Sequence, residues 1–310
     1  MKLNKLLSNR TAVLLLALLV CALWGSLFPM IKVGYSAFKI DTADIPSIIL
    51  FAGLRFTLSG VVLLAITSIG KRKLYIPHAR HLPIILIGAL FSIILHYGFT
   101  YVALALGEGS KSAIIKQLGF LFLICFAFLF DKNDSFSKKK LLAGFLGFAG
   151  IIATAYEGTG ITFRIGDLLL LLASLCSAVS TVVSKRATER VSPACYVAYT
   201  QLFGGVFLSA LGFLLGGRIT YLDFSSVIAF VYICSASIGA YVLWTALLKH
   251  GSMSMLSIIK FTEPLFAVIF SGMILGEDIF KVSYLAALVL LAASLLISHF
   301  PRSKNESKNI

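Results

Sequence analysis

Ten long apolar stretches constrain the fold of this chain more than any other feature of its sequence. A helix of about 20 apolar residues crosses the hydrocarbon core of a bilayer, which is roughly 30 Å thick. Backbone groups find no hydrogen-bond partner in lipid, so such stretches must form helices. The sequence predicts ten transmembrane helices, at Ala12–Val33, Ile45–Ile69, Leu82–Leu104, Ser112–Phe130, Leu141–Tyr156, Gly166–Ser184, Ala194–Leu215, Val227–Leu248, Met253–Leu275 and Val282–Ile297.

The composition indicates the same class of protein. Of the 310 residues, 59% are hydrophobic and 13% are charged, which lies far outside the range of soluble globular domains. A net charge of +14 would suggest nucleic acid as the partner of a soluble protein. Here the basic residues lie in short loops between apolar stretches, so we expect a lipid bilayer and no nucleic acid as partner.

The basic residues also predict the orientation of the chain in the membrane. With the N-terminus in the cytoplasm, 18 lysines and arginines fall on the cytoplasmic side and 4 on the opposite side. Such an excess marks cytoplasmic loops, so both termini are predicted to be cytoplasmic. The first apolar stretch is too long for the core of a signal peptide. The five cysteines lie in or beside apolar stretches without a C-x-x-C spacing, and we expect buried thiols rather than disulfides or metal ligands.

The chain repeats a short pattern in its two halves. Ile114–Lys116 matches Ile258–Lys260 at an offset of 144 residues. The two lysines lie in the predicted fourth and ninth helices, an odd number of helices apart, so the two halves would have opposite orientations in the membrane. This is the inverted-topology repeat of many secondary transporters. We therefore predict one five-helix repeat at 12–156, a second at 166–299 and a cytoplasmic tail at 300–310.

The repeated lysines are the first candidates for a functional site. Each lies about 10 Å from the face at which its own helix enters the membrane, and therefore near the midplane. Charges at that depth are costly and by default indicate function. Glu263 shares a helix face with Lys260, whereas Lys116 has Gly119 at the same spacing. Two lysines and one carboxylate predict an electropositive cavity for a carboxylate or phosphate; alternatively, Lys260 and Glu263 neutralise each other and are structural.

Several other side chains are candidates for the wall of that cavity. Arg55 lies in the middle of the second predicted helix and is either a substrate ligand or paired with backbone carbonyls or Glu263. Tyr and Trp give a cavity an apolar wall with a polar group, although most aromatic residues in such a chain face lipid or fill the bundle. The aromatic candidates are Trp24, Tyr97, Tyr101, Tyr241 and Trp244.

Three further residues have possible roles in coupling or movement. His96 is either a hydrogen-bonded contact between helices or, with Glu263, part of a proton relay, because its ordinary pKa lies near physiological pH. Pro29 and Pro264 lie inside predicted helices, where a proline frees a carbonyl and permits a kink. Kinks suit alternating access, but static bundles contain them too.

The motifs around these residues resemble a known family. The ninth predicted helix contains Glu263-Pro264-Leu-Phe-Ala-Val and then Leu275-Gly276-Glu277, the first contains Leu23-Trp24-Gly25-Ser26, and the second contains Arg55-Phe56. Together they resemble the EamA family of the drug/metabolite transporter superfamily over nearly the whole chain. In the first half, Gly119-Phe120 stands where Glu263-Pro264 stands in the second, which departs from the family pattern.

The resemblance implies a ten-helix transporter with both termini in the cytoplasm. It implies a central cavity lined by the first, third, fourth, sixth, eighth and ninth helices, and a location in the inner membrane of a bacterium. Family members move amino acids, nucleosides, vitamins, sugars or other metabolites. Export is common among them, and import also occurs.

We therefore predict a secondary transporter, with export the favoured direction, that works by alternating access. Its expected substrates are small metabolites such as amino acids or other carboxylate- or phosphate-bearing compounds, and it needs no cofactor or metal. A flippase or exporter of a larger amphipathic or lipid-linked compound is the alternative. An enzyme is not expected, because the sequence has no H-E-x-x-H, no G-x-S-x-G and no paired aspartates in the spans.

Overall fold

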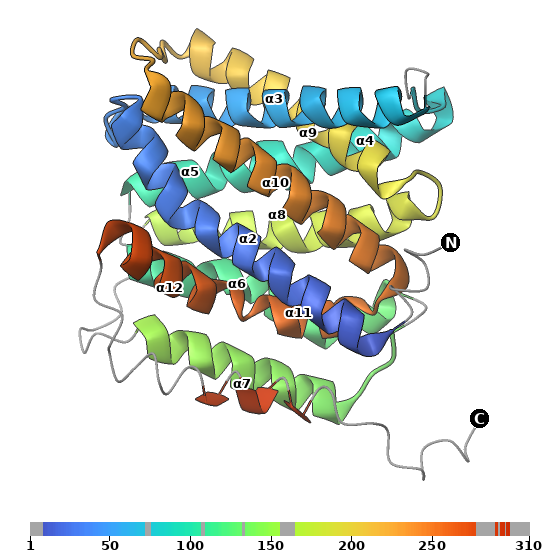
Figure 1. The fold of residues 1–310 in the computed structure, drawn as a ribbon. Helices are drawn as coiled ribbons and strands as arrows, with labels where there is room; N and C mark the ends of the chain where they lie inside the picture. The colour runs from blue at the N-terminus through green and yellow to red at the C-terminus, as the bar shows by residue number, and fades with distance from the viewer. Residues whose placement is uncertain are drawn as a thin grey trace.

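The computed structural model describes residues 9–71, 76–106, 109–131, 134–155, 165–276, 289–290, 292–294 and 296–297. All regular structure in these ranges is helical (Figure 1). In chain order the elements are α2 (Arg10–Ala37), α3 (Ile45–Lys71), η1 (Ala79–His81), α4 (Leu82–Ala89), η2 (Leu90–Leu95), α5 (His96–Leu106), α6 (Gly109–Phe126), η3 (Ala127–Leu129), α7 (Lys138–Ala155), α8 (Ile165–Thr188), α9 (Pro193–Leu214), α10 (Phe224–His250), α11 (Met253–Lys260) and α12 (Glu263–Leu275).

Within the described residues, seven helical segments are long and apolar enough to cross a membrane, which makes this an integral multi-pass membrane protein. They coincide with the first, second, third, sixth, seventh, eighth and ninth helices predicted from the sequence. The predicted fourth and fifth helices correspond to α6 and α7, which have 18 residues each. Most of the predicted tenth helix lies outside the described residues, so the total of ten stays a prediction. The seven segments are Thr11–Ala37, Ile45–Ile69, Ala79–Ala103, Ile165–Thr188, Pro193–Leu214, Phe224–His250 and Met253–Leu275.

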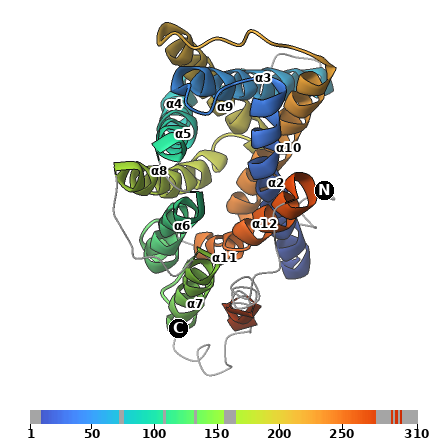
Figure 2. The same ribbon diagram turned by 90° about the vertical axis from the view of Figure 1, so that its left-hand side faces the viewer.

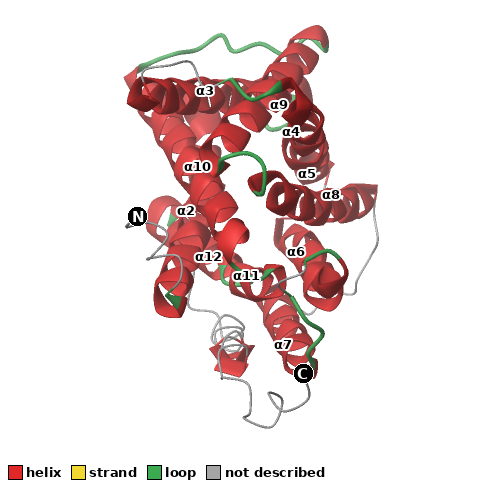
Figure 3. Cartoon of the chain, turned by 90° about the vertical axis from the view of Figure 1, so that its right-hand side faces the viewer, coloured by secondary structure: helices red, strands yellow, loops and turns green. Residues whose placement is uncertain are grey.

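The helices form two walls that face each other. Figures 2 and 3 show α4, α5, α6 and α8 on one side of the bundle and α2, α10 and α12 on the other. The paired helices α3 and α9 join the walls along one edge, and α6 and α11 meet along the opposite edge. Both walls combine helices from the two halves of the chain, so neither half forms a separate body.

The contact between α3 and α9 depends on small residues. The spacing of Gly53, Thr57 and Gly60 on α3 equals that of Gly205, Ser209 and Gly212 on α9. A side chain added at Gly53 would overlap the backbone nitrogen of Ser209, and one added at Gly205 would overlap that of Thr57.

The same contact brings two hydroxyl groups together. The Thr57 and Ser209 hydroxyl oxygens lie 3.5 Å apart. Small residues of this kind let helix backbones approach closely in membranes, where van der Waals packing rather than the hydrophobic effect holds helices together.

Two predicted helices depart from regular α-helix at the positions of candidate residues. The segment Met253–Leu275 is not one continuous helix: α11 ends at Lys260 and α12 begins at Glu263. Pro264 lies in the first turn of α12, where its missing N–H costs nothing. The third predicted helix contains the π-helical turn η2 directly before His96, a feature often found at functional sites. Pro29 lies inside α2 without interrupting it.

Enlarging a glycine in the α3–α9 contact should destabilise the protein. We expect Gly53→Ala and Gly205→Ala each to lower the free energy of unfolding by about 1–3 kcal/mol, because the added methyl group overlaps a neighbouring backbone. Thermal unfolding of the detergent-purified protein measures the change. Gly98→Ala is the matched control, since a Cβ at this helical glycine meets no atom within 4 Å. Equal unfolding temperatures for all three variants would contradict the role of the glycines.

Candidate functional site

A cavity lies between the two walls of the bundle. It contains three charged side chains, from α6, α11 and α12, with aromatic and hydroxyl-bearing residues around them. Its lining residues are Trp24, Ser92, His96, Tyr97, Lys116, Gln117, Phe120, Ser177, Ser180, Thr181, Ser184, Tyr196, Val197, Thr200, Tyr241, Trp244, Thr245, Lys260 and Glu263.

Two of the charges neutralise each other across the break between α11 and α12. Lys260 ends α11, Glu263 begins α12, and their side chains form an ion pair. The ammonium nitrogen of Lys260 also lies 3.1 Å from the ring centroid of Trp24 and 5.4 Å from that of Trp244. Aromatic ring faces attract cations electrostatically, so Lys260 is compensated twice. This geometry agrees with the structural alternative for the pair.

Lys116 is in a different position. Its ammonium group makes no hydrogen bond or ion pair to any described residue, and it lies 4.8 Å from the ring centroid of Phe28. The neighbouring Gln117 is buried, and its side-chain carbonyl oxygen also has no partner among these residues. A cation inside an apolar bundle requires a counter-charge or water. Lys116 therefore brings to the cavity an ammonium group that has no direct ion pair or hydrogen bond among the described residues.

Close helix contacts explain two of the motif residues. Gly119 stands where Glu263 stands in the second half, and a side chain there would overlap the carbonyl oxygen of Ser174 on α8. The tight contact between α6 and α8 therefore excludes a glutamate at this position. A side chain at Gly25 would overlap Phe266 of α12, so this glycine lets α2 carry Trp24 up to Lys260.

Four of the five aromatic candidates line the cavity. The ring of Trp24 meets those of Tyr241 and Trp244 edge-on, with centroids 5.4 and 5.5 Å apart. The hydroxyl of Tyr241 donates to that of Tyr97 at 3.0 Å, which links α10 to α5. Tyr101 does not line the cavity; it packs behind Tyr97 with a centroid separation of 5.9 Å.

His96 contacts the backbone of α8. Its Nδ1 lies 2.9 Å from the carbonyl oxygen of Ala173. A carbonyl only accepts, so Nδ1 carries the proton in this contact. This is the helix–helix hydrogen bond that we gave as one of the two roles of His96. Its participation in a proton relay stays a prediction.

Arg55 is completely buried and does not line the cavity. The central carbon of its guanidinium lies 4.3 Å from the ring centroid of Phe56 and 5.3 Å from that of Tyr97. None of its three nitrogens makes a hydrogen bond of ordinary geometry to a described residue. The expected pairing with backbone carbonyls or Glu263 is therefore not made.

A row of hydroxyl groups on α8 was not among the residues that we singled out from the sequence. Ser177, Ser180, Thr181 and Ser184 recur at helical spacing and all line the cavity. Residues at positions i, i+3, i+4 and i+7 share one face of a helix. Their regular spacing within an apolar stretch is the signal in the sequence that indicates them. They give the cavity a neutral wall rich in hydrogen-bonding groups.

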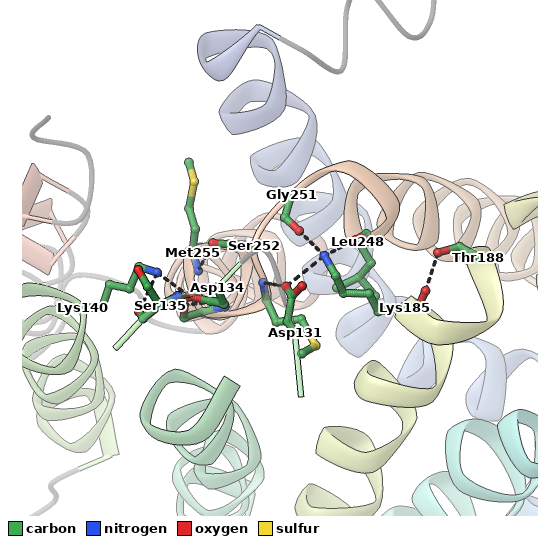
Figure 4. A network of polar contacts seen from close by, with 12 residues as sticks. Asp131, Asp134, Ser135, Lys140, Lys185, Thr188, Leu248, Gly251, Ser252 and Met255 are labelled. Carbon is green, nitrogen blue, oxygen red and sulfur yellow. Dashed lines mark hydrogen bonds and ion pairs between the residues drawn. The ribbon is translucent and has the colours of Figure 1, made fainter. Parts of the chain in front are cut away.

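An ion pair with hydrogen bonds to backbone links the two walls at one end of the bundle (Figure 4). Lys185 of α8 forms an ion pair with Asp131 at 2.9 Å. Its ammonium also donates to the carbonyl oxygens of Leu248 at 2.9 Å and Gly251 at 2.6 Å. Because Lys185 directly follows Ser184, this network lies next to the hydroxyl-bearing wall of the cavity.

Asp134 extends the network toward α7 and α11. Its carboxylate accepts from the backbone N–H of Ser254 at 2.9 Å and forms an ion pair with Lys140. Burial alone would raise the pKa of Asp134, but the hydrogen bonds from Lys140 and Ser254 outweigh it, so the pKa lies below the usual carboxyl range. From the sequence, Asp134 and Lys140 were placed in a loop and Ser254 in the ninth predicted helix, and no contact between them was predicted.

Comparison with known proteins identifies the family. The sequence profile of the EamA-like transporter family matches residues 11–156 and again residues 164–299. The chain belongs to this family. Among similar proteins, the uncharacterized transporter YvbV of Bacillus subtilis (strain 168) is 29% identical, with 95% of this chain and 93% of the relative covered. The uncharacterized inner membrane transporter YedA of Escherichia coli (strain K12) is 27% identical, with 89% and 87% covered.

A solved structure has the same fold. A crystal structure of a protein superimposes with a TM-score of 0.76 and covers 94% of this chain and 99% of the other. The two sequences are 20% identical. At that level the comparison shows the fold alone. The EamA family membership and the fold together make this chain a membrane transporter, and the named relatives leave its substrate unassigned.

Removing the carboxylate beside Lys260 should destabilise the protein strongly. We expect Glu263→Gln to lower the free energy of unfolding by about 3–5 kcal/mol, because it leaves a buried ammonium without its counter-charge. The double variant Glu263→Gln/Lys260→Met should recover part of the loss. Thermal unfolding in detergent measures both. Glu189→Gln, at an exposed glutamate, is the control, and a single variant as stable as the wild type would contradict the paired charges.

The contribution of Asp134 should depend on pH. A carboxylate with a lowered pKa stabilises the folded state above its ordinary pKa of about 3.9, and this stabilisation is lost as the pH falls through the folded-state value. We therefore expect Asp134→Asn to unfold at a lower temperature than the wild type at pH 7, with the difference shrinking below about pH 4. Asp41→Asn, at an exposed aspartate, is the control. A difference that does not change with pH would contradict this account.

Proposed function

We propose that this protein is a secondary transporter of small polar metabolites that carry a carboxylate or phosphate, and that the central cavity holds the substrate. The observation that carries the proposal is the ammonium of Lys116 in that cavity, since this group has no direct ion pair or hydrogen bond among the described residues. Lys260 and Glu263 already neutralise each other, so the net charge of the described cavity is positive. A substrate anion would supply the missing counter-charge.

The neutral wall of the cavity supports a small polar substrate over the flippase alternative. The hydroxyls of Ser177, Ser180, Thr181 and Ser184 face the space that the substrate would occupy. Such groups would hydrogen-bond amino, hydroxyl or amide groups of a metabolite. Thr181 and Ser184 already donate to the carbonyl oxygen of Ser177 and the hydroxyl of Tyr196. An acyl chain would leave the hydroxyls of Ser177 and Ser180 without a partner among the described residues, which is costly in a buried site.

Alternating access between two inverted repeats is part of the same proposal. Tyr97 and Tyr241, which hydrogen-bond to each other, are separated by 144 residues, the offset that also separates Lys116 and Lys260. A contact between equivalent positions of two repeats supports a pseudo-twofold axis through it. The break before Pro264 gives the ninth segment a point at which its two parts can tilt.

The orientation in the proposed cycle follows from the charges of the loops, and the membrane and the favoured direction follow from the family. We place both termini in the cytoplasm of a bacterium and the protein in its inner membrane, with export as the favoured direction. Proton coupling would use Glu263 and His96. In this orientation the network around Lys185 and Asp131 lies on the cytoplasmic side and holds the two walls together there.

Binding should follow the charge of Lys116. A ligand that binds only the folded state raises its stability by about 2.7 kcal/mol at 100 times its dissociation constant. In a thermal-shift screen of metabolites, we expect carboxylates or phosphates to raise the unfolding temperature of the wild type by several degrees and that of Lys116→Ala far less. Lys249→Ala, at an exposed lysine, should respond as the wild type does. Stabilisation only by neutral or cationic compounds, equal in all three proteins, would contradict the proposal.

Transport should show the same dependence. We expect Lys116→Glu to abolish uptake or efflux of the compound found in the screen while the protein still inserts in the membrane at wild-type levels. The reversed charge would repel the substrate anion from the cavity. Transport assays with reconstituted vesicles measure the effect, and unchanged transport by this variant would refute the assigned role of Lys116.

A further inference from the structure

Arg55 is a fully buried cation that lacks a counter-charge among the described residues. Its exposed fraction is 0%, and none of its three nitrogens has a hydrogen-bond partner of ordinary geometry. A charged group in an apolar interior is costly unless it is both paired and hydrogen-bonded. The arrangement around Arg55 is therefore incomplete without a further group that accepts hydrogen bonds.

The surroundings of Arg55 are aromatic rather than acidic. The guanidinium lies against the rings of Phe56 and Tyr97, and it is close enough to Tyr101 to interact electrostatically. The hydroxyl of Tyr101 is buried and has no partner in the part of the chain that the structure describes. The cavity carboxylate, Glu263, already contacts Lys260. An anion for Arg55 must then come from outside the described chain.

Arg55 lies one side chain away from the central cavity. Tyr97 and Tyr241 line the cavity, and Arg55 lies behind Tyr97. The hydrogen bond between the two tyrosines joins one wall of the bundle to the other. Because this pair stands between Arg55 and the cavity, a ligand in the cavity would reach Arg55 only if the pair separated.

A cluster of aromatic rings lies on the side of Arg55 that faces away from Tyr97. Phe51 lies one turn before Arg55 on α3, and its ring meets those of Tyr35, Phe38 and Phe230. Phe230 lies early in α10, whereas Leu248, in the network around Lys185, lies near its end. Arg55 thus lies beside the cavity, toward the end of the bundle opposite to that network.

We propose that Arg55, with Tyr97 and Tyr101, forms a second binding site for the carboxylate of the transported substrate, occupied when the Tyr97–Tyr241 hydrogen bond opens. This inference rests on the proposed function, with Lys116 as the first site. A guanidinium binds carboxylate through two parallel hydrogen bonds, and the tyrosine hydroxyls can donate further ones. The substrate anion would pass from the ammonium to the guanidinium as the cavity changes the side to which it opens.

The test uses the full chain in detergent, in a chloride-free buffer with a bulky anion, and sodium acetate as the probe. Lys116→Met removes the first site, so the acetate response that remains reports on Arg55. We expect Lys116→Met to keep a saturable rise of the unfolding temperature with acetate, and Lys116→Met/Arg55→Met to lose it. Lys116→Met/Arg186→Met is the matched control, because Arg186 is exposed, and it should respond as Lys116→Met does.

A second measurement separates an anion site from a purely structural arginine. Without acetate, Arg55→Met should unfold at or above the wild-type temperature, because it removes a buried charge that has no partner. Unfolding several degrees below the wild type would mean that Arg55 is paired within the folded chain, and would overturn the proposal.

The remaining outcomes distinguish the two proposals from each other. Complete loss of the acetate response in Lys116→Met would overturn the second site and leave the cavity site intact. An equal response of Lys116→Met to sodium chloride would assign the site to an inorganic anion and overturn the substrate carboxylate as its occupant. If the wild type itself shows no response to acetate, and no carboxylate or phosphate in the metabolite screen stabilises it, both proposals fail.

Discussion

The cost of a charge in an apolar bundle is the constraint on which the interior of this protein depends. Lys260 is compensated by Glu263 and two aromatic rings, and Lys185 by Asp131 and two backbone carbonyls. The contacts of each of these two lysines join elements from different parts of the chain. Lys116 and Arg55 lie against aromatic rings but have no ion pair or hydrogen bond of ordinary geometry among the described residues, and both lie in or beside the space between the walls. The charges with direct partners and those without are therefore distinguished by what surrounds them rather than by residue type.

Glycines determine how closely the elements that carry these charges approach. Gly25 allows α2 to bring Trp24 to Lys260, and Gly119 allows α6 to lie against α8. The glycines on α3 and α9 hold the walls together along one edge. In lipid, where helices gain little from hiding apolar surface from one another, such close contacts provide much of the packing energy. Glycines such as Gly25 and Gly119 thus permit the close helix contacts around the cavity.

The sequence was sufficient to predict a helical membrane protein, and it singled out three charged residues that line one cavity. Hydropathy located the seven candidate spans of the described residues. An apolar chain in a bilayer forms helices because only internal hydrogen bonds can satisfy its backbone groups there. Lys116, Lys260 and Glu263, which were selected by their depth in the membrane and by the repeat, line the same cavity. The seclusion of Arg55 and Tyr101 behind Tyr97 could not be read from the sequence, because helix periodicity does not say which neighbour covers a face. The Lys185–Asp131 pair was missed for a similar reason: its partners come from a loop and a helix end, where spacing carries no information.

The interruption at Phe261 and Thr262 also affects the electrostatics of the site through the backbone. It ends one helix and begins another in the middle of the apolar segment, so each end carries the partial charge of a helix dipole. Lys260 lies at the negative end of α11, and Glu263 lies at the positive end of α12. The aligned peptide groups therefore place partial charges at this depth in the membrane, and these do not depend on pH. A chain stripped of both side-chain charges would still present an anion-attracting helix start beside the cavity.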